Sequence, residues 1–388
     1  MSGPSFFDVA VVGAGPAGCP AALALSRAGF RVVIFEKAEL PRYKTCGGGL
    51  IARTLTLLPI DVRTVIERQC YSADLHHHGP RLTYSTRRDT PVVSMVMRDR
   101  FDHTLTLAAE QAGVRIMART TVLKVRASRE SVVLLTTAGE FTAGFVIAAD
   151  GVMSAVAAQC GFPNLRRVIP ALEYEMTVDD ERFERFSLAA RFDFGLTPRG
   201  YGWVFPKKNQ LSVGVLTTRK GCCNLNHEYR RYLKAIGLNE SIGEQRHGYM
   251  IPVLPRDGLF TVPRVLLVGD AAGLADPVTA EGISGAILSG QLAATAVIQN
   301  PENADGAMDA YRVALRATLL PELRIARVLA RGLYDFPGLR GWLFSRHGQE
   351  LGEFVTDVMM GAARYRDGVR RPKNYFKLLR LRSRSSVG

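Results

Sequence analysis

The hydrophobic residues of this chain follow two different spacings, and each spacing predicts a different kind of β-strand. Near-continuous apolar runs at 7–12, 31–35 and 264–268 have the length of strands buried on both faces of a parallel sheet. Apolar and polar residues alternate in a later region, as in antiparallel strands with one covered face, at 171–178, 187–195, 201–206 and 210–218. We therefore expect an α/β fold in which a parallel sheet is joined to a separate antiparallel sheet.

Helical patterns connect and follow these strands. Small residues dominate 16–29, directly after the first strand, and again the segment that follows Gly282. Residues 226–238 predict a surface helix, and most of the chain after about 301 is helical in pattern. The chain therefore begins with a strand, a helix of small residues and a second strand.

A glycine-rich turn joins this first strand to the first helix. Gly13 permits the tight turn, Gly15 lets a pyrophosphate touch the backbone, and Gly18 lets helix and strand pack closely. Glu36, at the end of the second strand, can accept hydrogen bonds from a ribose diol and would repel a 2′-phosphate. Because all these parts occur in order, we expect an adenine dinucleotide, FAD or NAD rather than NADP.

A second strand-to-helix module favours FAD over NAD. The run at 264–268 ends at Gly269 and Asp270, and Gly282 opens another helix of small residues. A plain NAD dehydrogenase does not require this module. A flavin does, because its ribityl chain needs an acceptor and its ring carbonyls need backbone donors at a helix start.

The composition indicates which class of protein and which cellular compartment to expect. Hydrophobic residues at 47% and charged residues at 22% are ordinary for a soluble globular protein. The six cysteines include no CxxC pair, and no secretory leader pattern is visible at the N-terminus. We therefore expect a cytoplasmic protein without a structural metal site or a disulfide framework.

The positive charge is concentrated near the C-terminus. The net charge is +14, and the residues from Tyr311 to the end carry 16 Lys and Arg against 6 Asp and Glu. Residues 364–384 interleave nine basic residues with aromatic and aliphatic ones. No nucleic-acid-binding motif accompanies this charge, so we expect an anionic membrane surface, not nucleic acid, as the partner. The protein would then dock peripherally on the inner membrane.

Several motifs together resemble a known family. The N-terminal glycine motif, VIAADGVMSAV at 146–156 and LLVGDAAGLADPVTAEGI at 266–283 are similar to motifs of FAD-dependent oxidoreductases of the p-hydroxybenzoate hydroxylase fold. Within that group, PRYKTCGGGL at 41–50 and YGWVFPK at 201–207 resemble the geranylgeranyl reductase family. That family carries a CGGG-type loop against the flavin and a YxWxFPK motif in its prenyl-chain pocket. The chlorophyll-pathway branch tends to have CGGA instead, so this chain departs from it.

The resemblance implies three groups of flavin contacts. Contacts to the ADP half are implied for Ala17, Gly18 and Glu36, and for the backbone of Val122. Contacts by the pyrophosphate and the ring are implied for Cys46, Gly47, Gly49 and Arg100. Contacts to the ribityl chain and the pyrimidine edge are implied for Asp270, Gly282 and Ile283. On this interpretation the glycines after Cys46 let flavin and substrate approach the backbone, with the thiol close enough to take part.

The resemblance and the strand patterns together suggest domain boundaries. The Rossmann-like FAD-binding domain, of the GR2 or p-hydroxybenzoate hydroxylase type, would be discontinuous and comprise 1–75, 98–165 and 258–300. An inserted antiparallel-sheet substrate domain would comprise 76–97 and 166–257. C-terminal helices and a basic tail would occupy 301–388.

The substrate pocket is expected along the strand at 201–206. Tyr201, Trp203 and Phe205 alternate and so share one face, which the resemblance makes a pocket wall where the pattern alone also permits ordinary sheet core. Lys207 is either a solvated turn lysine or the cation that meets a substrate phosphate. The run His76–His78 is expected in a solvated turn, because no second cluster of metal ligands accompanies it.

The function that these features predict is the reduction of carbon–carbon double bonds in a geranylgeranyl or other prenyl chain. The chain could be carried by a diphosphate, a lipid or a quinone. Reduced FAD would give a hydride, and Cys46 and Tyr201 are candidate acids, although Cys46 could equally be a small residue packed under the ring. Electrons must come from outside, from NAD(P)H or a ferredoxin, because the sequence contains no second nucleotide site.

Two other functions remain open from the sequence. A monooxygenase or halogenase of the same fold is one, because YxWxFP is close to the WxWxIP pattern of flavin-dependent halogenases, with Tyr201 in place of the first Trp. A non-catalytic flavoprotein that passes electrons to a membrane quinone or partner is the other. A closed, fully packed substrate side would favour this last function.

Overall fold

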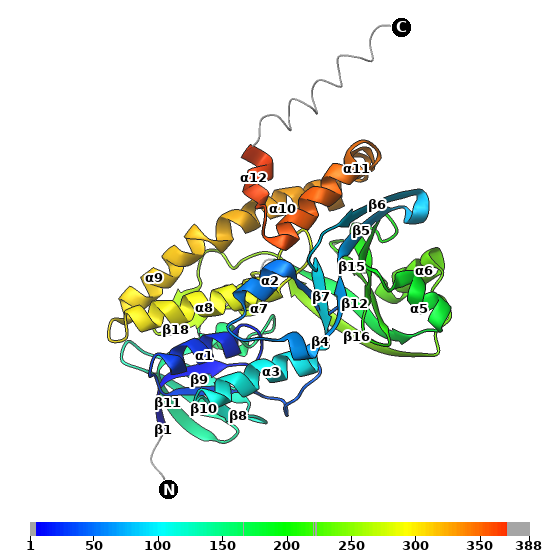
Figure 1. Ribbon diagram of the computed structural model, residues 1–388. Helices are drawn as coiled ribbons and strands as arrows, with labels where there is room; N and C mark the ends of the chain where they lie inside the picture. The colour runs from blue at the N-terminus through cyan, green and yellow to red at the C-terminus, as the bar shows by residue number, and fades with distance from the viewer. Residues whose placement is uncertain (1–4, 166, 220, 222, 371–388) are drawn as a thin grey trace.

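The computed structural model describes residues 5–370 except 166, 220 and 222. In this part of the chain the strands form an eight-stranded, a seven-stranded and a three-stranded sheet, with helices packed around them (Figure 1). Most of the predicted basic segment at 364–384 lies outside the described residues.

The eight-stranded sheet holds the predicted nucleotide-binding strands. Its order is β17-β18-β11-β1-β2-β8, with β9 and β10 joined through β11. The bounds are β1 Ser5–Val12, β2 Val32–Phe35, β8 Arg115–Met117, β9 Val122–Ala127, β10 Val132–Thr136, β11 Gly139–Ala148, β17 Thr261–Val262 and β18 Val265–Leu267. β1 pairs in parallel with both β2 and β11, so its apolar run is buried on both faces, as predicted.

Helices pack on this sheet and on one another. They are α1 Gly18–Arg27, α3 Arg98–Gln111, α4 Ala155–Gln159, α7 Gly269–Ala272, α8 Ile283–Gln299 and α9 Ala304–Ala317. Among them, α1 and α8 are rich in small residues. Gly290 of α8 lies directly against α1, because a Cβ there would stand 2.1 Å from the backbone oxygen of Ala17. This close approach brings the two predicted strand-to-helix modules together.

The seven-stranded sheet is the predicted antiparallel region. Its order is β16-β12-β15-β14-β13-β5-β6, with only β13 and β5 parallel to each other among the described pairs. The bounds are β5 Ser72–His77, β6 Leu82–Arg87, β12 Val168–Thr177, β13 Ala189–Phe194, β14 Gly200–Pro206, β15 Leu211–Thr217 and β16 Gly243–Pro252. Its strands β12 to β15 match the four segments predicted from alternation.

This sheet is covered on both faces. Helices α5 Asp180–Phe186 and α6 Leu225–Ile236 pack on one face, where α6 fits the predicted surface helix (Figure 1). Helices α10 Leu319–Asp335, α11 Pro337–Met360, which bends at His347, and α12 Tyr365–Arg370 pack on the other. The C-terminal helices therefore return to the antiparallel sheet and do not form a separate appendage.

A small third sheet links the two larger ones. Its order is β3-β7-β4, with bounds β3 Gly49–Ile51, β4 Ile66–Cys70 and β7 Val93–Val96, and α2 Ala52–Leu57 follows β3. Two single 3₁₀ turns, Arg63–Val65 and Gly79–Arg81, flank β4 and β5. The strand that begins at Gly49 is therefore where the glycine loop after Cys46 enters the sheet.

Residues 72–78 differ from two predictions. β5 begins at Ser72, before the predicted domain boundary at 76. His76 and His77 are buried in this strand, and only His78 is exposed, with a left-handed backbone (φ 56°). The solvated-turn interpretation of His76–His78 is therefore wrong for the first two residues, because β5 pairs with both β6 and β13 and is an interior strand.

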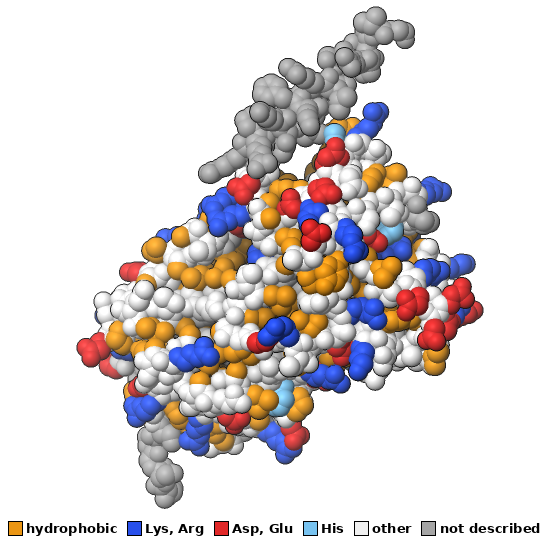
Figure 2. All heavy atoms as spheres, in the orientation of Figure 1, with side chains coloured by type: hydrophobic (Ala, Val, Ile, Leu, Met, Phe, Trp, Pro, Cys, Tyr) orange, Lys and Arg blue, Asp and Glu red, His pale blue; other side chains and the backbone are white. Residues whose placement is uncertain are grey.

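The surface is mixed in charge on the face that Figure 2 shows. Lysine and arginine side chains are scattered among acidic and hydrophobic ones and do not gather into one basic stripe (Figure 2). No helix within the described residues is long and apolar enough to cross a membrane.

Candidate cofactor and substrate site

The first glycine turn is shaped by close backbone contacts. Gly13 has φ +107°, and a Cβ there would stand 2.4 Å from the backbone oxygen of Ala149. A Cβ at Gly18 would stand 2.1 Å from the backbone oxygen of Gly13. At Gly15 the nearest atom is Nη2 of Arg42 at 3.5 Å, so this position is open beside a guanidinium group. Gly13 and Gly18 thus hold the turn, and Gly15 leaves room for an anion next to a cation.

Glu36 lies beside this turn, as predicted from its place after β2. It is 4% exposed and accepts hydrogen bonds from the backbone nitrogens of Ala14 and Ala38, each at 3.0 Å. The backbone nitrogen of Thr120 donates to the Glu36 backbone oxygen at 2.8 Å, which places the start of β9 at Val122 next to this corner. Glu36 and Val122 therefore come together although 86 residues separate them in sequence.

Helix α3 carries two arginines with different surroundings. The side chain of Arg100 is exposed and lies 3.5 Å from Glu67. Arg98 is buried and donates to Asp102 at 2.8 and 2.9 Å. Burial opposes the charge of Arg98 most strongly, but Asp102 and the sulfur of Cys46 together outweigh it and raise the pKa of the guanidinium group. The resemblance implied a flavin contact for Arg100, but Arg100 lies at the surface. Arg98 is the arginine of α3 that belongs to the buried charged pair with Asp102.

Asp102 connects Arg98 to the glycine turn. It is 1% exposed and also forms an ion pair with Arg42 at 3.2 Å, and Arg42 reaches the backbone oxygen of Ala14 at 3.4 Å. Lys44 adds a third cation. Burial, more than the nearby Arg98 charge, lowers the pKa of Lys44 to about 8.

The second module places its predicted residues side by side. Asp270, in α7, accepts a hydrogen bond from the hydroxyl of Tyr249 at 3.0 Å. A Cβ on Gly282 would stand 3.3 Å from the carboxylate of Asp270, and Ile283 begins α8 directly afterwards. A carboxylate and a helix N-terminus thus face the same region, which is the arrangement predicted for a ribityl chain and a flavin ring edge. Tyr249, from β16, is a neighbour that the sequence did not reveal.

The three glycines after Cys46 pack tightly against protein groups. A Cβ on Gly47 would stand 2.9 Å from the ring of Phe205, and a Cβ on Gly49 would stand 3.0 Å from Val93. Gly48 has φ +70°, and its Cβ would stand 2.1 Å from the backbone oxygen of Val96. The sequence assigned this space to flavin and substrate, but protein atoms take much of it. The thiol of Cys46 accepts a hydrogen bond from the Gly48 nitrogen at 3.4 Å.

Lys207 is buried under this loop. It is 1% exposed, its Nζ donates to the backbone oxygen of Val96 at 3.2 Å, and it lies 3.8 Å from Glu175. The interpretation of Lys207 as a solvated turn lysine is therefore wrong, because the preceding strand carries it into the interior. To bind a substrate phosphate, the ammonium group of Lys207 would have to break its contacts with Val96 and Glu175.

A series of hydrogen-bonded side chains leads from the glycine loop after Cys46 into the seven-stranded sheet. The indole of Trp203 donates to Ser212 at 3.3 Å, and Ser212 donates to Glu173 at 2.5 Å. Glu173 is 1% exposed, burial raises its pKa, and its second oxygen has no hydrogen-bond partner among the described residues. This buried acid was not predicted, because Glu173 is a polar position of an alternating strand and only the packing on both faces of the sheet buries it.

The aromatic residues of β14 form one continuous row. The ring centroids of Tyr201 and Trp203 are 6.2 Å apart, and those of Trp203 and Phe205 are 6.4 Å apart. Phe205 and Trp203 contact the glycine loop, whereas Tyr201 lines a cavity of about 490 Å³. The row therefore connects the Cys46 loop to the cavity, and the shared face predicted for the three side chains is confirmed.

Segments that are far apart in sequence line this cavity. Its walls come from β5, β13 and β14 on one side and from α10, α11 and α12 on the other, and they are almost entirely hydrophobic. Val328 and Phe336, which line it, are 68% and 54% exposed, so the cavity opens to solvent at α10 and the start of α11. The contribution of the C-terminal helices was not predicted.

Tyr201 holds its proton firmly. Its hydroxyl donates to the backbone oxygen of Thr279 at 2.5 Å. Burial, reinforced by the charge of Asp276, raises the pKa of Tyr201 well above its ordinary value. Both features disfavour release of this proton during a reaction.

Comparison with known proteins agrees with this geometry. A model of the FAD binding domain family matches residues 7–202. A digeranylgeranylglycerophospholipid reductase of Methanopyrus kandleri is 31% identical over 321 residues, which cover 77% of this chain and 82% of that protein. The chain belongs to the geranylgeranyl reductase family of FAD-dependent oxidoreductases.

Other relatives of this family member differ in the substrate that their names state. A menaquinone reductase of Mycolicibacterium smegmatis is 28% identical over 312 residues, covering 74% of this chain and 75% of that protein. The crystal structure of a geranylgeranyl bacteriochlorophyll reductase-like protein of Thermoplasma acidophilum has a TM-score of 0.79 and 24% identity, covering 98% of this chain and 100% of that one. This likeness confirms the predicted fold class.

The residues of this geranylgeranyl reductase family member fit FAD. The open position at Gly15 lies beside Arg42, which is ion-paired with Glu36 and Asp102, and Arg98 and Lys44 lie close by as further donors suited to a pyrophosphate. Asp270 and the start of α8 suit the ribityl chain and the ring edge. The fold itself therefore arranges the groups that suit FAD around the glycine turn and the start of α8.

Proposed function

We propose that this enzyme reduces carbon–carbon double bonds of a prenyl chain that lies in the cavity beside β14. The observation that carries the proposal is the cavity of about 490 Å³, whose walls are almost entirely hydrophobic. Cavities of about 300–1,000 Å³ accommodate small-molecule ligands, and a hydrocarbon chain needs no polar partners in such walls. Tyr201, Trp203 and Phe205 lead from this cavity to the loop that is expected to border the flavin.

The protein's task in this chemistry is to position the alkene and to exclude water. Saturation of a double bond adds a hydride to one carbon and a proton to the other. Reduced FAD supplies the hydride when it is bound. An isolated alkene is poorly polarised, so the aromatic row must hold it in line, and the apolar walls must keep competing water away.

Cys46 is the better of the two predicted candidates for the proton donor. Its thiol is partly exposed and lies in the loop at the end of the aromatic row. Tyr201, in contrast, donates its proton to the backbone oxygen of Thr279 and has a raised pKa. We infer that Tyr201 shapes the pocket and that Cys46, or water that it orders, delivers the proton.

The external reductant is proposed to be NAD(P)H or a ferredoxin that reacts with the flavin without a lasting complex. A peripheral position on an anionic membrane surface is part of the same proposal. A prenyl substrate is itself lodged in a bilayer, and the exposed hydrophobic residues Val328 and Phe336 at the cavity opening suit contact with lipid.

Mass spectrometry tests the function directly. FAD-saturated protein is reduced with dithionite without oxygen and mixed with geranylgeranyl diphosphate, a geranylgeranyl ether lipid and a menaquinone. We expect a product mass increase of about two units for each reduced bond in at least one substrate. Unchanged masses in every substrate, with the flavin demonstrably reduced, would reject the proposal.

The same experiment separates the alternatives. A monooxygenase or halogenase needs oxygen, so product formation in its absence excludes both. The electron-transfer alternative expects a closed substrate side, and the open cavity beside Tyr201 argues against it.

A further inference from the structure

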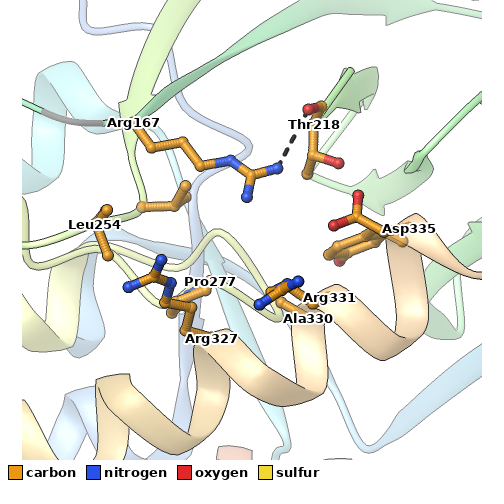
Figure 3. Close-up of a pocket in the computed structure, with 10 residues that line it drawn as sticks. Arg167, Thr218, Leu254, Pro277, Arg327, Ala330, Arg331 and Asp335 are labelled. Carbon is orange, nitrogen blue, oxygen red and sulfur yellow. Dashed lines mark hydrogen bonds between the residues drawn. The ribbon is translucent and has the colours of Figure 1, made fainter. Parts of the chain in front are cut away.

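Charged side chains occur in two different settings along β12. Directly before the strand, Arg167 lies across a hollow of about 20 Å³ from Arg327 and Arg331 of α10, which are both exposed to solvent (Figure 3). Further along the strand, Glu173 and Glu175 are only 1% and 8% exposed. A carboxyl group away from water is costly unless it is hydrogen-bonded, paired or protonated, so the buried acids are the pair that needs an explanation.

Glu173 belongs to a row of residues that crosses the seven-stranded sheet. His247 of β16 and Gly214 of β15 are its direct partners on the two neighbouring strands. Gly214 is in turn paired with Trp203 of β14. Directly opposite residues place their side chains on the same face of a sheet. A Cβ on Gly214 would stand 2.1 Å from the indole of Trp203, so the glycine gives this ring its room and the row leads from Trp203 to the buried acid.

Hydrogen bonds connect this row to the loop that contains Cys46. The indole nitrogen of Trp203 would stand 3.2 Å from a Cβ on Gly47, the residue after Cys46. This nitrogen donates to Ser212, and Ser212 donates to Oε1 of Glu173. Oε2 of Glu173 is buried and has no hydrogen-bond partner among the described residues. One oxygen is therefore fixed, and the other is able to carry a proton or to bond a water molecule.

Titratable side chains from four segments face Glu173. They are Glu175 on the same strand, Lys207 after β14, His247 on β16 and Tyr43 in the loop before Cys46. Burial raises the pKa of Glu173 and outweighs the charge of Lys207 and the hydrogen bond from Ser212, which lower it. Glu175 adds to the rise, and His247 opposes it. The site therefore keeps Glu173 protonated to a higher pH than an exposed glutamate.

Tyr43 connects this acid to solvent and to Cys46. It is 40% exposed, its hydroxyl donates to Glu175 at 3.4 Å, and its ring centroid lies 4.1 Å from that of His247. Burial raises the pKa of Tyr43, and the charges of Glu173, Glu175 and Cys46 each add to the rise, so these three groups lie around its phenol. Tyr43 and Glu175 therefore lie between the buried acid and solvent.

We propose that Glu173 is the acid that returns a proton to Cys46 during reduction of the prenyl chain. The proposal rests on the proposed function and names the group that resupplies its proton donor. One alkene carbon takes a hydride from bound reduced FAD, and the other takes the proton of the Cys46 thiol. The thiolate that remains takes the proton of Glu173 through water, and Glu173 is protonated again from solvent by way of Tyr43 and Glu175. Each reduced bond thus consumes one hydride from the flavin and one proton from solvent.

Glu173→Gln separates proton transfer from mere support of Trp203. Glutamine has nearly the same shape and its oxygen still accepts from Ser212, but its amide cannot act as an acid. Glu173→Asp keeps an acid at this position. Glu244→Gln is the matched control, because Glu244 is an exposed carboxylate on the neighbouring strand β16. Flavin absorbance and the Tm of each FAD-saturated variant establish that it folds.

The first measurement is the pH dependence of turnover between about pH 6 and 9, without oxygen and with excess dithionite. The substrate is the one that the mass-spectrometry test identifies. We expect the wild-type kcat to fall as the pH rises, because the acid form of Glu173 is required. Glu173→Gln should lower kcat about a hundredfold with little change in KM and should weaken this pH dependence. Glu173→Asp should restore part of the rate, with the fall at a lower pH because aspartic acid is the stronger acid.

Infrared spectroscopy of the FAD-bound protein tests the acid without turnover. The C=O stretch of a protonated carboxyl group is separate from the bands of a carboxylate. The difference spectrum between the wild type and Glu173→Gln at pH 7 should contain the protonated band. The difference spectrum for Glu244→Gln should contain only carboxylate bands.

Three results would overturn the proposal. A wild-type rate and pH profile in Glu173→Gln would mean that Glu173 only supports Trp203 through Ser212. Carboxylate bands for Glu173 at pH 7 would mean that it holds no proton to give. If Glu173→Gln does not fold, a fall at the wild-type pH in Glu173→Asp would reject the role. A wild type that reduces no prenyl substrate rejects the proposed function itself, so the two failures are distinguishable.

Discussion

At the scale of single residues, the loop after Cys46 has no room for side chains. Gly48 combines a left-handed backbone with a backbone oxygen 2.1 Å from where its Cβ would be, and the ammonium group of Lys207 would be 2.9 Å away. A flexible side chain could move aside, but the backbone of Val96 belongs to β7 and is held by the third sheet. The loop, the lysine and β14 are therefore fixed relative to one another by contacts that only glycine permits.

Gly48→Ala is predicted to destabilise the protein strongly. A left-handed backbone costs a residue with a Cβ about 1–2 kcal/mol, and the clash with Val96 adds to this cost. Gly258→Ala is the matched control, because Gly258 has φ +79° and no atom within 4 Å of the added Cβ. Chemical denaturation should show a loss for Gly48→Ala well above that for Gly258→Ala. Equal losses would mean that the close contact does not matter.

His77 is predicted to weaken the fold as the pH falls. Its ring stacks on Phe344 and lies 3.4 Å from the Nε of Arg340, and burial lowers its pKa to about 4 from 6.5. Because the unfolded chain binds the proton more readily, stability is lost as the pH falls from about 6.5 towards 4, by at most about 3 kcal/mol from this residue.

The comparison for this prediction is His77→Gln against His78→Gln. Glutamine at 77 keeps an acceptor for Arg340 but does not titrate, so the free energy of unfolding should depend less on pH between 7 and 4.5. His78 is exposed and its charge adds to the lowering of the His77 pKa, so His78→Gln should depend on pH slightly less than the wild type but clearly more than His77→Gln. Parallel pH profiles for all three proteins would contradict the prediction.

At the scale of elements, periodicity decides which side chains reach the site. In α3, Arg98 shares a buried face with Phe101 and Leu105, at spacings of three and seven residues, whereas Arg100 faces solvent. This period was available in the sequence and would have distinguished the two arginines. In β14 the period of two was sufficient, and it placed Tyr201, Trp203 and Phe205 in one row.

Trp203→Ala is predicted to leave FAD bound and to reduce prenyl turnover about a hundredfold. Loss of a large buried aromatic side chain costs on the order of 3 kcal/mol in a packed site, which corresponds to this change in rate if the contact positions the substrate. Trp342→Ala is the matched control, because it changes the other tryptophan of the chain, which is 41% exposed on α11. Flavin absorbance and anaerobic turnover are the measurements. Normal turnover in Trp203→Ala would mean that the row serves only the sheet core.

At the scale of the whole molecule, the C-terminal part of the chain packs against a sheet that is formed mainly by its middle part. The C-terminal helices lie over the antiparallel sheet (Figure 1). Together with β5, β13 and β14 they line the hydrophobic cavity. Tyr365 of α12 lines this cavity, so even the last described helix contributes to the substrate side. The cofactor side, in contrast, is built around the parallel sheet by the first 150 residues and by α7 and α8.

The purified protein is predicted to be yellow, with FAD bound without a covalent bond. The expected pyrophosphate site lies beside Arg42, Arg98 and Lys44, and no flavin-attachment motif is present in the sequence. Heating should release FAD into the supernatant, and removal of FAD should lower the Tm, because a ligand at a hundred times its Kd stabilises by about 2.7 kcal/mol. Flavin that stays with the denatured protein would contradict the prediction.

Peripheral binding to anionic liposomes is predicted to depend on the basic C-terminal segment. Each basic residue near an anionic leaflet contributes about 1 kcal/mol. The chain should be truncated after Arg370, because a cut at Arg364 would also remove Tyr365 from the cavity. Full-length protein should sediment with anionic vesicles at low salt and less at high salt, and the truncated protein should not. Equal sedimentation of both at every salt concentration would reject this role.

The sequence by itself determined what depends on local spacing. Buried strands, the turn at Gly13, Gly15 and Gly18, the acid at Glu36 and the alternation along β14 all follow from neighbours within a few residues, because strand and helix periods are local properties. The resemblance in the loop at 41–50 and along β14 at 201–207 indicated the family, which the comparisons confirmed.

Only the tertiary structure decided which distant segments meet. The burial of Lys207 and His77, the pairing of Tyr249 with Asp270 and the cavity between β14 and α10 involve residues whose contacts lie far away in sequence. A lysine after a strand or a hydrophobic helix face has the same local pattern whether solvent or a distant sheet covers it. Its role is therefore set by the packing that covers it, which no local period encodes.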